Sequence, residues 1–189
     1  MKKLTLLLIA TSFFSIAVAQ EHVTFLGVSF NTPLDAFIDS LVSKGYTVKF
    51  NNHTTEASLY GDFAGVTGVE VKINSTVKSH LITSVKVTKK DKREALKYKY
   101  KSLVERFEKK YGELPADRKK SVYLDMQGYG NDLGHAIFEL KDNGDAKYGL
   151  IWISYSQEDY SDELSILYED SKNCKIAKRE KETTVDNDI

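Results

Sequence analysis

The residue types that could carry chemistry gather on one predicted sheet face near the C-terminus. Strands are expected over Ser121–Gln127, His135–Lys141 and Lys147–Ser156. When neighbouring strands pair as simple hairpins, their odd-numbered residues share one face. The candidate ligand-binding or partner-binding residues on it are Tyr123, Asp125, His135, Glu139 and Tyr155. Asp125 and His135 would be diagonal neighbours, near enough to share a ligand or a metal ion.

Three interpretations of this face stay open. In the first, it is a half-solvated surface whose isoleucines, Ile137, Ile151 and Ile153, pack under a loop. In the second, it binds a ligand or a partner, and in the third, His135 and a carboxylate form a catalytic pair. If a helix covered the face, the next candidates would be the loops at Asn51–Glu56 and Gly128–Gly134.

The even-numbered face of the same strands is expected to be core. Closing the two hairpins at their turns places both Met126 and Trp152 opposite Ala136. Every even-numbered position is then apolar, and the largest side chain faces the smallest. This agreement predicts the register of the three strands and the burial of Trp152.

Recognised catalytic motifs are absent from the sequence. It contains no Gly-x-Ser-x-Gly, no Walker phosphate loop, no His-Glu-x-x-His and no Cys-x-x-Cys. The glycines of Gly128–Gly134 join two strands, whereas a phosphate loop leads into a helix. Asp142–Asp145 lacks the ligand spacing and closing glutamate of a calcium loop. We therefore predict no catalytic residue, no metal ligand and no cofactor.

The N-terminus has the features of a cleavable signal peptide over residues 1–19. A basic Met1–Lys3 precedes the apolar run Leu4–Ile16, and Ala17-Val18-Ala19 fits signal peptidase, which predicts cleavage between Ala19 and Gln20. The run is shorter than the roughly 20 apolar residues that span a bilayer. We expect an exported protein, periplasmic or secreted, with no membrane span after cleavage.

Charge and cysteine content narrow the class of partner. The 27 basic residues of the full chain equal its 27 acidic residues, and loss of Lys2 and Lys3 leaves 25 against 27. Such a chain has no positive field to attract nucleic acid. The single cysteine, Cys174, is either an exposed thiol or the site of an intermolecular disulfide.

The remaining pattern predicts two main helices and further strands. Thr32 and Pro33 favour the start of a first helix, and Gly45 favours its end. The apolar stripe of this helix is Leu34, Phe37, Ile38 and Leu41. A longer helix is expected over Glu94–Tyr111 and a short one over Asp159–Ser171. The other expected strands are Phe25–Phe30, Tyr46–Phe50, Leu59–Phe63, Val69–Ile73 and Leu81–Val87.

These elements predict an α+β fold with an antiparallel sheet, in the order β-α-β4-α-β3-α. We expect one domain over residues 20–171, with two helix-plus-meander halves at 20–90 and 91–171. Residues 172–189 are charged and poor in apolar side chains, and so predict a disordered tail.

Several turns of the chain resemble a family of uncharacterised exported proteins common in Bacteroidetes. The resemblance rests on the opening Phe25–Phe30, the helix exit at Ser43–Tyr46, the Gly61–Gly65 hairpin and the Lys110-Tyr111-Gly112 helix exit. It implies export and a shared fold, and it carries no known activity. At Asn31-Thr32-Pro33, where that family more often has a glycine-containing turn, the chain departs from the pattern.

The sequence thus favours a non-enzymatic binding or interaction module of the bacterial envelope or exterior. Its partner would be a protein or a polar ligand. The alternative is an exported hydrolase that uses His135 with Asp125 or Glu139.

Overall fold

The structure is a computed structural model that describes residues 22–120, 132–142, 146–158 and 161–185. Its helices are α1 (Leu34–Val42), α2 (Arg93–Tyr111) and α3 (Ser171–Val185), with a 3-10 turn at Ala116–Arg118. The strands are β1 (Thr24–Phe25), β2 (Val28–Ser29), β3 (Thr47–Asn51), β4 (Glu56–Phe63), β5 (Val66–Ser75), β6 (Ile82–Asp91), β7 (Lys119–Lys120), β8 (Asp132–Lys141), β9 (Lys147–Glu158) and β10 (Ser161–Asp170).

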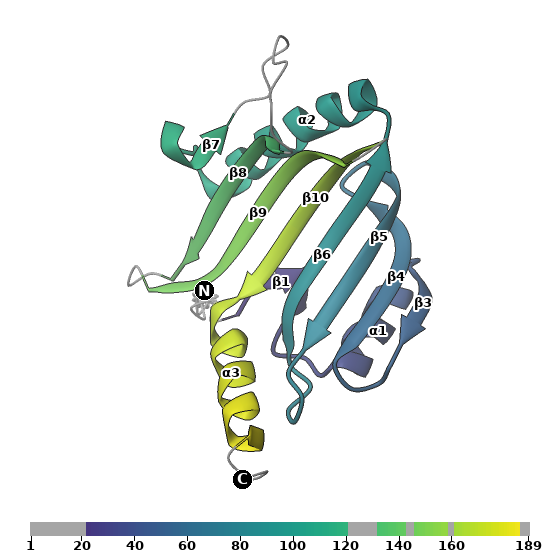
Figure 1. Ribbon diagram of the computed structural model, residues 1–189, viewed down its shortest axis with the longest axis vertical. Helices are drawn as coiled ribbons and strands as arrows, with labels where there is room; N and C mark the ends of the chain where they lie inside the picture. Colours follow the sequence, from purple (N-terminus) through teal and green to yellow (C-terminus); the bar gives the residue numbers. More distant parts are fainter. Residues whose placement is uncertain (1–21, 121–131, 143–145, 159–160, 186–189) are drawn as a thin grey trace, which may run out of the picture.

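Strands β3 to β10 form one eight-stranded antiparallel sheet in the order β3-β4-β5-β6-β10-β9-β8-β7 (Figure 1). The predicted α+β class and antiparallel sheet are therefore confirmed. The first four of these strands come from the predicted first half and the last four from the second. They meet where β6 pairs with β10, so both stretches build the same sheet.

The core lies between this sheet and the two helices behind it in Figure 1, α1 and α2. A line of buried, cross-strand neighbours runs through six strands: Leu59, Val71, Val87, Ile166, Ile153 and Ala136. Helix α2 packs aromatic rings on this face, with Phe107 at 5.8 Å from Phe138 and Tyr100 at 6.1 Å from Tyr155. We call this side the covered face and the opposite side the open face.

The N-terminal part follows the prediction except at its first turn. The single strand expected over Phe25–Phe30 is instead the β1–β2 hairpin, because Leu26 and Gly27 both adopt positive φ values, 51° and 79°. Such a pair matches the tight type I′ turn. The next helix, α1, buries the four predicted stripe residues, although Pro33, and not Thr32, is its N-cap.

The predicted short helix over Asp159–Ser171 is wrong, because the described part of that stretch is the central strand β10. Leu164, Ile166 and Tyr168 alternate at the strand period of two and point to the covered face, where all three are buried. The predicted element order is wrong here and at the β1–β2 hairpin.

The prediction of a disordered tail from Lys172 is also wrong, because residues up to Val185 form α3. Asp170 caps this helix: its Oδ1 accepts hydrogen bonds from the N–H groups of Lys172 and Asn173, at 3.0 and 2.9 Å. The buried Asn173 amide then donates to the carbonyl oxygens of Phe30 and Ile82, at 3.0 and 2.8 Å. Polar contacts, which an apolar pattern does not reveal, hold the helix in place.

The thiol of Cys174 is half-buried rather than exposed. It donates a hydrogen bond to the carbonyl oxygen of Thr83 at 3.8 Å. Burial raises the pKa of Cys174 to about 11. The thiolate that forms disulfides is therefore scarce at neutral pH.

Candidate functional site

The structure separates the residues that were predicted to share a face. His135 and Glu139 lie on the open face of β8, as expected. Tyr155 lies on the covered face and is 1% exposed, against the prediction. Tyr123 and Asp125 lie outside the described residues, as does most of the Gly128–Gly134 loop.

A β-bulge explains why Tyr155 changes face. Lys141 pairs with Lys147, which is the register that closing the turn predicts. The next pair is Leu140 with Gly149, so Tyr148 is an extra residue on β9. Beyond it, Ala136 faces Ile153 instead of Trp152. The predicted register is therefore wrong from Gly149 to Tyr155, because one residue of slip turns every side chain of that stretch to the other face.

Tyr155 belongs to a buried polar group that anchors α2. Its hydroxyl donates a hydrogen bond to Asp162 Oδ2, which also accepts one from Arg93 Nε at 3.2 Å. Burial, and then the hydrogen bond to Asp162, raise the pKa of Tyr155 well above its usual value. The phenol therefore stays protonated, and it joins β9 and β10 to the first residue of α2.

The open face carries a row of three apolar side chains, Ile137, Trp152 and Leu167. They are direct cross-strand neighbours on β8, β9 and β10. Trp152 is 43% exposed, while Ile137 and Leu167 are half-buried. The prediction that Trp152 is core is wrong, and the three side chains, here called the apolar row, are the main apolar surface of this part of the open face.

Polar side chains line the apolar row on both sides. On one side, His135 lies opposite Ser154, whose hydroxyl contacts that of Ser165 at 2.8 Å. On the other side, Glu139 and Glu169 flank Leu150. An apolar centre with a polar rim is the usual anatomy of a protein interface.

Charged pairs continue the open face toward the middle of the sheet. Glu163, almost buried, binds Lys86 Nζ at 3.1 Å and Lys90 Nζ at 3.7 Å. Lys86 is also the cross-strand neighbour of Lys72, and like charges placed opposite each other repel. An acidic group on a partner would reduce this repulsion.

The geometry gives the catalytic interpretation no support within the described residues. His135 and Glu139 are four residues apart on one strand, which separates them by about 13 Å. Glu139 forms ion pairs with Arg118 at 3.1 Å and Lys147 at 3.4 Å, and the hydrogen bond from Arg118 lowers the pKa of Glu139. An acid held ionised in this way is a poor proton donor at neutral pH. Nor do any described His, Cys, Asp and Glu residues gather as a metal site.

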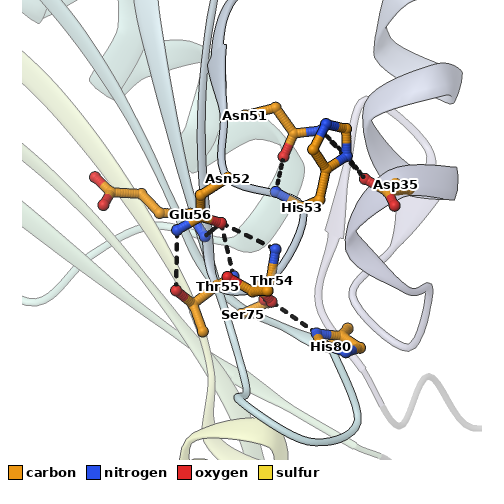
Figure 2. A network of polar contacts seen from close by, with 9 residues as sticks. All are labelled: Asp35, Asn51, Asn52, His53, Thr54, Thr55, Glu56, Ser75 and His80. Carbon is orange, nitrogen blue, oxygen red and sulfur yellow. Dashed lines mark hydrogen bonds and ion pairs between the residues drawn. The ribbon is translucent and has the colours of Figure 1, made fainter.

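A second polar cluster lies toward the opposite edge of the sheet, in the turn between β3 and β4 (Figure 2). Asn52 Oδ1 accepts hydrogen bonds from the N–H groups of Thr54, Thr55 and Glu56, at 2.9 to 3.0 Å. This is an Asx-type turn, in which a side chain takes the place of a backbone acceptor. It fixes the backbone of the loop that the sequence offered as the next candidate.

The same turn is tied to its neighbours on two sides. Asp35 of α1 contacts Asn51 Nδ2 at 3.1 Å and His53 Nδ1 at 3.2 Å, and these hydrogen bonds, that of Asn51 first, lower the pKa of Asp35. On the other side, the carbonyl oxygen of Thr54 contacts Ser75 Oγ at 3.0 Å and His80 Nδ1 at 2.7 Å. Glu56 extends away from this network in Figure 2, so its carboxylate is available to solvent or a ligand.

Comparison of the chain with protein-family models, with curated proteins and with solved structures found no match. Within the described ranges, no helix has the length and apolarity needed to cross a membrane. The candidate site therefore rests on the geometry of the open face and of the Asn51–Glu56 turn.

Proposed function

We propose that this chain is an exported binding module that engages a partner protein through the open face of its sheet. The observation that carries the proposal is Trp152, which is 43% exposed between Ile137 and Leu167 on the face away from α1 and α2. Tryptophan is among the residues that contribute most to protein interfaces, chiefly when it lies at their centre.

The dimensions of the face support a protein partner. Its six longest strands have 8 to 12 residues. With strands about 4.8 Å apart and a rise of about 3.3 Å per residue, they span roughly 900 Å². A stable protein interface takes about 800 Å² from each partner, so the face can supply one whole side of such an interface.

The chemistry of the face indicates what the partner presents. An apolar cluster would cover the apolar row, and a carboxylate would lie over Lys72, which faces Lys86 across the strands, while Lys86 itself already pairs with Glu163. This electrostatic match would guide the orientation of the partner. Export, and membership of the Bacteroidetes family that the turns resemble, are parts of the same proposal and rest on the N-terminal sequence and those turns.

The test begins with affinity capture on the mature chain, residues 20–189, from the envelope and culture fluid, followed by mass spectrometry. Each retained protein is then purified, and its affinity is measured for the wild type and for Trp152→Ala. We expect a loss of at least about tenfold in affinity, because burying an indole at an interface centre contributes more than about 1.4 kcal/mol.

The matched control is Tyr98→Ala. Tyr98 is an aromatic residue on α2 that is 70% exposed, and α2 covers the other side of the sheet. This variant should bind the partner like the wild type. Equal affinity of Trp152→Ala and wild type would refute the proposal, and so would retention of a glycan instead of a protein.

A further inference from the structure

A groove lies between α3 and the ends of β4, β5 and β6. It has a volume of about 600 Å³, which is within the range of small-molecule sites. One wall is a stripe of α3 at the spacing of a single helix face: Cys174, Ala177, Lys178 and Lys181. The facing wall comes from the chain on both sides of the β5–β6 hairpin and from the turn of Figure 2: Thr55, Glu56, Asn74, Ser75, Thr76, Val77 and Thr83.

The helix that forms this wall is fixed at both ends. Its N-terminus is held by Asp170 and Asn173, as described above. Near its C-terminus, Glu180 accepts hydrogen bonds from the N–H groups of Lys78 and Ser79, at 2.8 and 3.2 Å. Figure 1 shows α3 running beside the hairpin that joins β5 and β6. The groove is therefore a fixed feature of the fold, bridged by a helix attached at two points.

The charges that line the groove are not used by the fold. Neither Lys178 nor Lys181 forms an ion pair with any residue in the described part of the chain, and the same holds for the Glu56 carboxylate. Residues three apart on a helix are neighbours, so the two ammonium groups repel each other. An anion placed between them would remove this repulsion and gain two charge-assisted hydrogen bonds.

The facing wall adds preorganised hydrogen-bonding groups. Thr55 Oγ1 accepts a hydrogen bond from Asn52 at 3.2 Å, and the hydroxyl donates none to the described residues. The Asn52 side chain also holds the backbone of Thr55 and Glu56. A ligand would meet donors and an acceptor that are already in position, which lowers the entropic cost of binding.

From this arrangement we propose that the groove binds a small organic anion. Its carboxylate or phosphate group would lie between Lys178 and Lys181, and a hydroxyl or amino group at its other end would donate to Glu56. The lone carboxylate on the facing wall disfavours ligands that are negatively charged throughout. Hydroxy acids and sugar phosphates have the required chemistry. This inference is independent of the protein partner proposed for the open face.

The test uses the mature chain, ¹⁵N-labelled, and four probes: gluconate, glucose 6-phosphate, acetate and inorganic phosphate. We expect gluconate or glucose 6-phosphate to shift the amide signals of Thr55, Thr76 and Lys178, with an affinity at least about tenfold above that of acetate or inorganic phosphate. The stronger of the first two identifies the anionic group as carboxylate or phosphate. Equal binding of all four probes, or no shift with gluconate and glucose 6-phosphate, overturns the proposal.

Two double variants separate the groove from the overall charge of α3. Lys178→Gln with Lys181→Gln should weaken binding by at least about tenfold. Lys175→Gln with Arg179→Gln removes the same charge from the same helix at positions that do not line the groove, and it should bind like the wild type. Equal losses in both double variants, or none in the first, contradict the proposal. Circular dichroism melts confirm that each variant is folded.

Discussion

The covered and open faces of β9 are built from neighbouring residues in opposite environments. Ile153 lies on the covered face and is fully buried, while Trp152, one residue earlier, is 43% exposed. The larger apolar side chain therefore lies on the side toward solvent. Hydrophobic burial alone would favour the reverse arrangement, since an indole removes more apolar surface from water than a branched aliphatic side chain does.

The extra residue at Tyr148 decides which side chains of β9 lie on the covered face and which lie on the open face. Tyr148 pairs with no residue of β8, and Gly149 follows it at a point where a side chain would meet Val23 and the carbonyl oxygen of Glu169. The bulge thus places Ile151, Ile153 and Tyr155 in the core. This comparison predicts that neighbouring substitutions on β9 and β10 will affect stability and binding very differently.

The largest expected effect is on the covered face. Ile153→Ala should lower the free energy of unfolding by about 3 kcal/mol, because it leaves a cavity beside Ala136 and Ile166. Urea denaturation followed by far-ultraviolet circular dichroism measures it. Trp152→Ala, the neighbouring substitution, should cost less than about 1 kcal/mol. A reversed order of these two values would mean that β9 has the register without the bulge.

The contrast with the N-terminal part shows which features a single sequence predicts well. The stripe Leu34, Phe37, Ile38 and Leu41 was correct, because the helical period alone brings these four residues to one face of α1, and that face is buried. In β10, Leu164, Leu167 and Tyr168 fit a helical spacing, and Leu164, Ile166 and Tyr168 fit a strand equally well. Only pairing with both β6 and β9 decides between them.

The candidate site was predictable in part for the same reason. His135 and Glu139 were placed on the open face because β8 has no irregularity between them. Trp152 was missed because no residue type marks the bulge at Tyr148. Lys178 and Lys181 were missed because polar groups hold α3, although the spacing of Cys174 and the two lysines was a usable signal.

The second expected effect concerns α3, at the edge of the open face. Asn173→Ala should cost about 2 kcal/mol, because the buried carbonyl oxygens of Phe30 and Ile82 lose their donor. Asn173→Asp, nearly equal in shape, should cost at least as much, since it turns a carboxylate oxygen toward those carbonyls. The exposed Lys175→Ala is the control and should leave the melting temperature nearly unchanged. An Asn173→Ala variant as stable as the wild type would show that α3 is not docked.

A third, smaller effect follows from placing Tyr155 on the covered face. Tyr155→Phe should lower the free energy of unfolding by about 1 kcal/mol, because Asp162 loses one donor and keeps Arg93. The pH dependence gives a second measurement. Since the pKa of Tyr155 is raised in the folded state, the unfolded chain loses this proton first, and stability falls as pH rises above about 10.

The Tyr155→Phe variant should lack this alkaline loss of unfolding free energy. The curves of unfolding free energy against pH for the wild type and the variant should therefore converge as the pH rises. The sign is fixed by linkage, because the folded state binds more protons in this range. Curves that stay parallel from neutral pH to pH ~11 would indicate a tyrosine that ionises as readily in the folded chain as in the unfolded one.

The smallest expected effect requires no substitution and reports on the open face alone. Trp152 is the one tryptophan of the chain, so intrinsic fluorescence excited at the indole band has a single source. An indole that is 43% exposed should be quenched by acrylamide more than a core tryptophan and less than the same residue in urea.

A bound partner protein should then reduce the acrylamide quenching of Trp152, because it covers the apolar row. Gluconate or glucose 6-phosphate in the α3 groove should leave the quenching unchanged, since Trp152 does not line that groove. Quenching as weak as that of a buried indole in the free protein would place Trp152 in the core and remove the basis for a binding face, whereas protection by the small anions would mean that they bind on the open face.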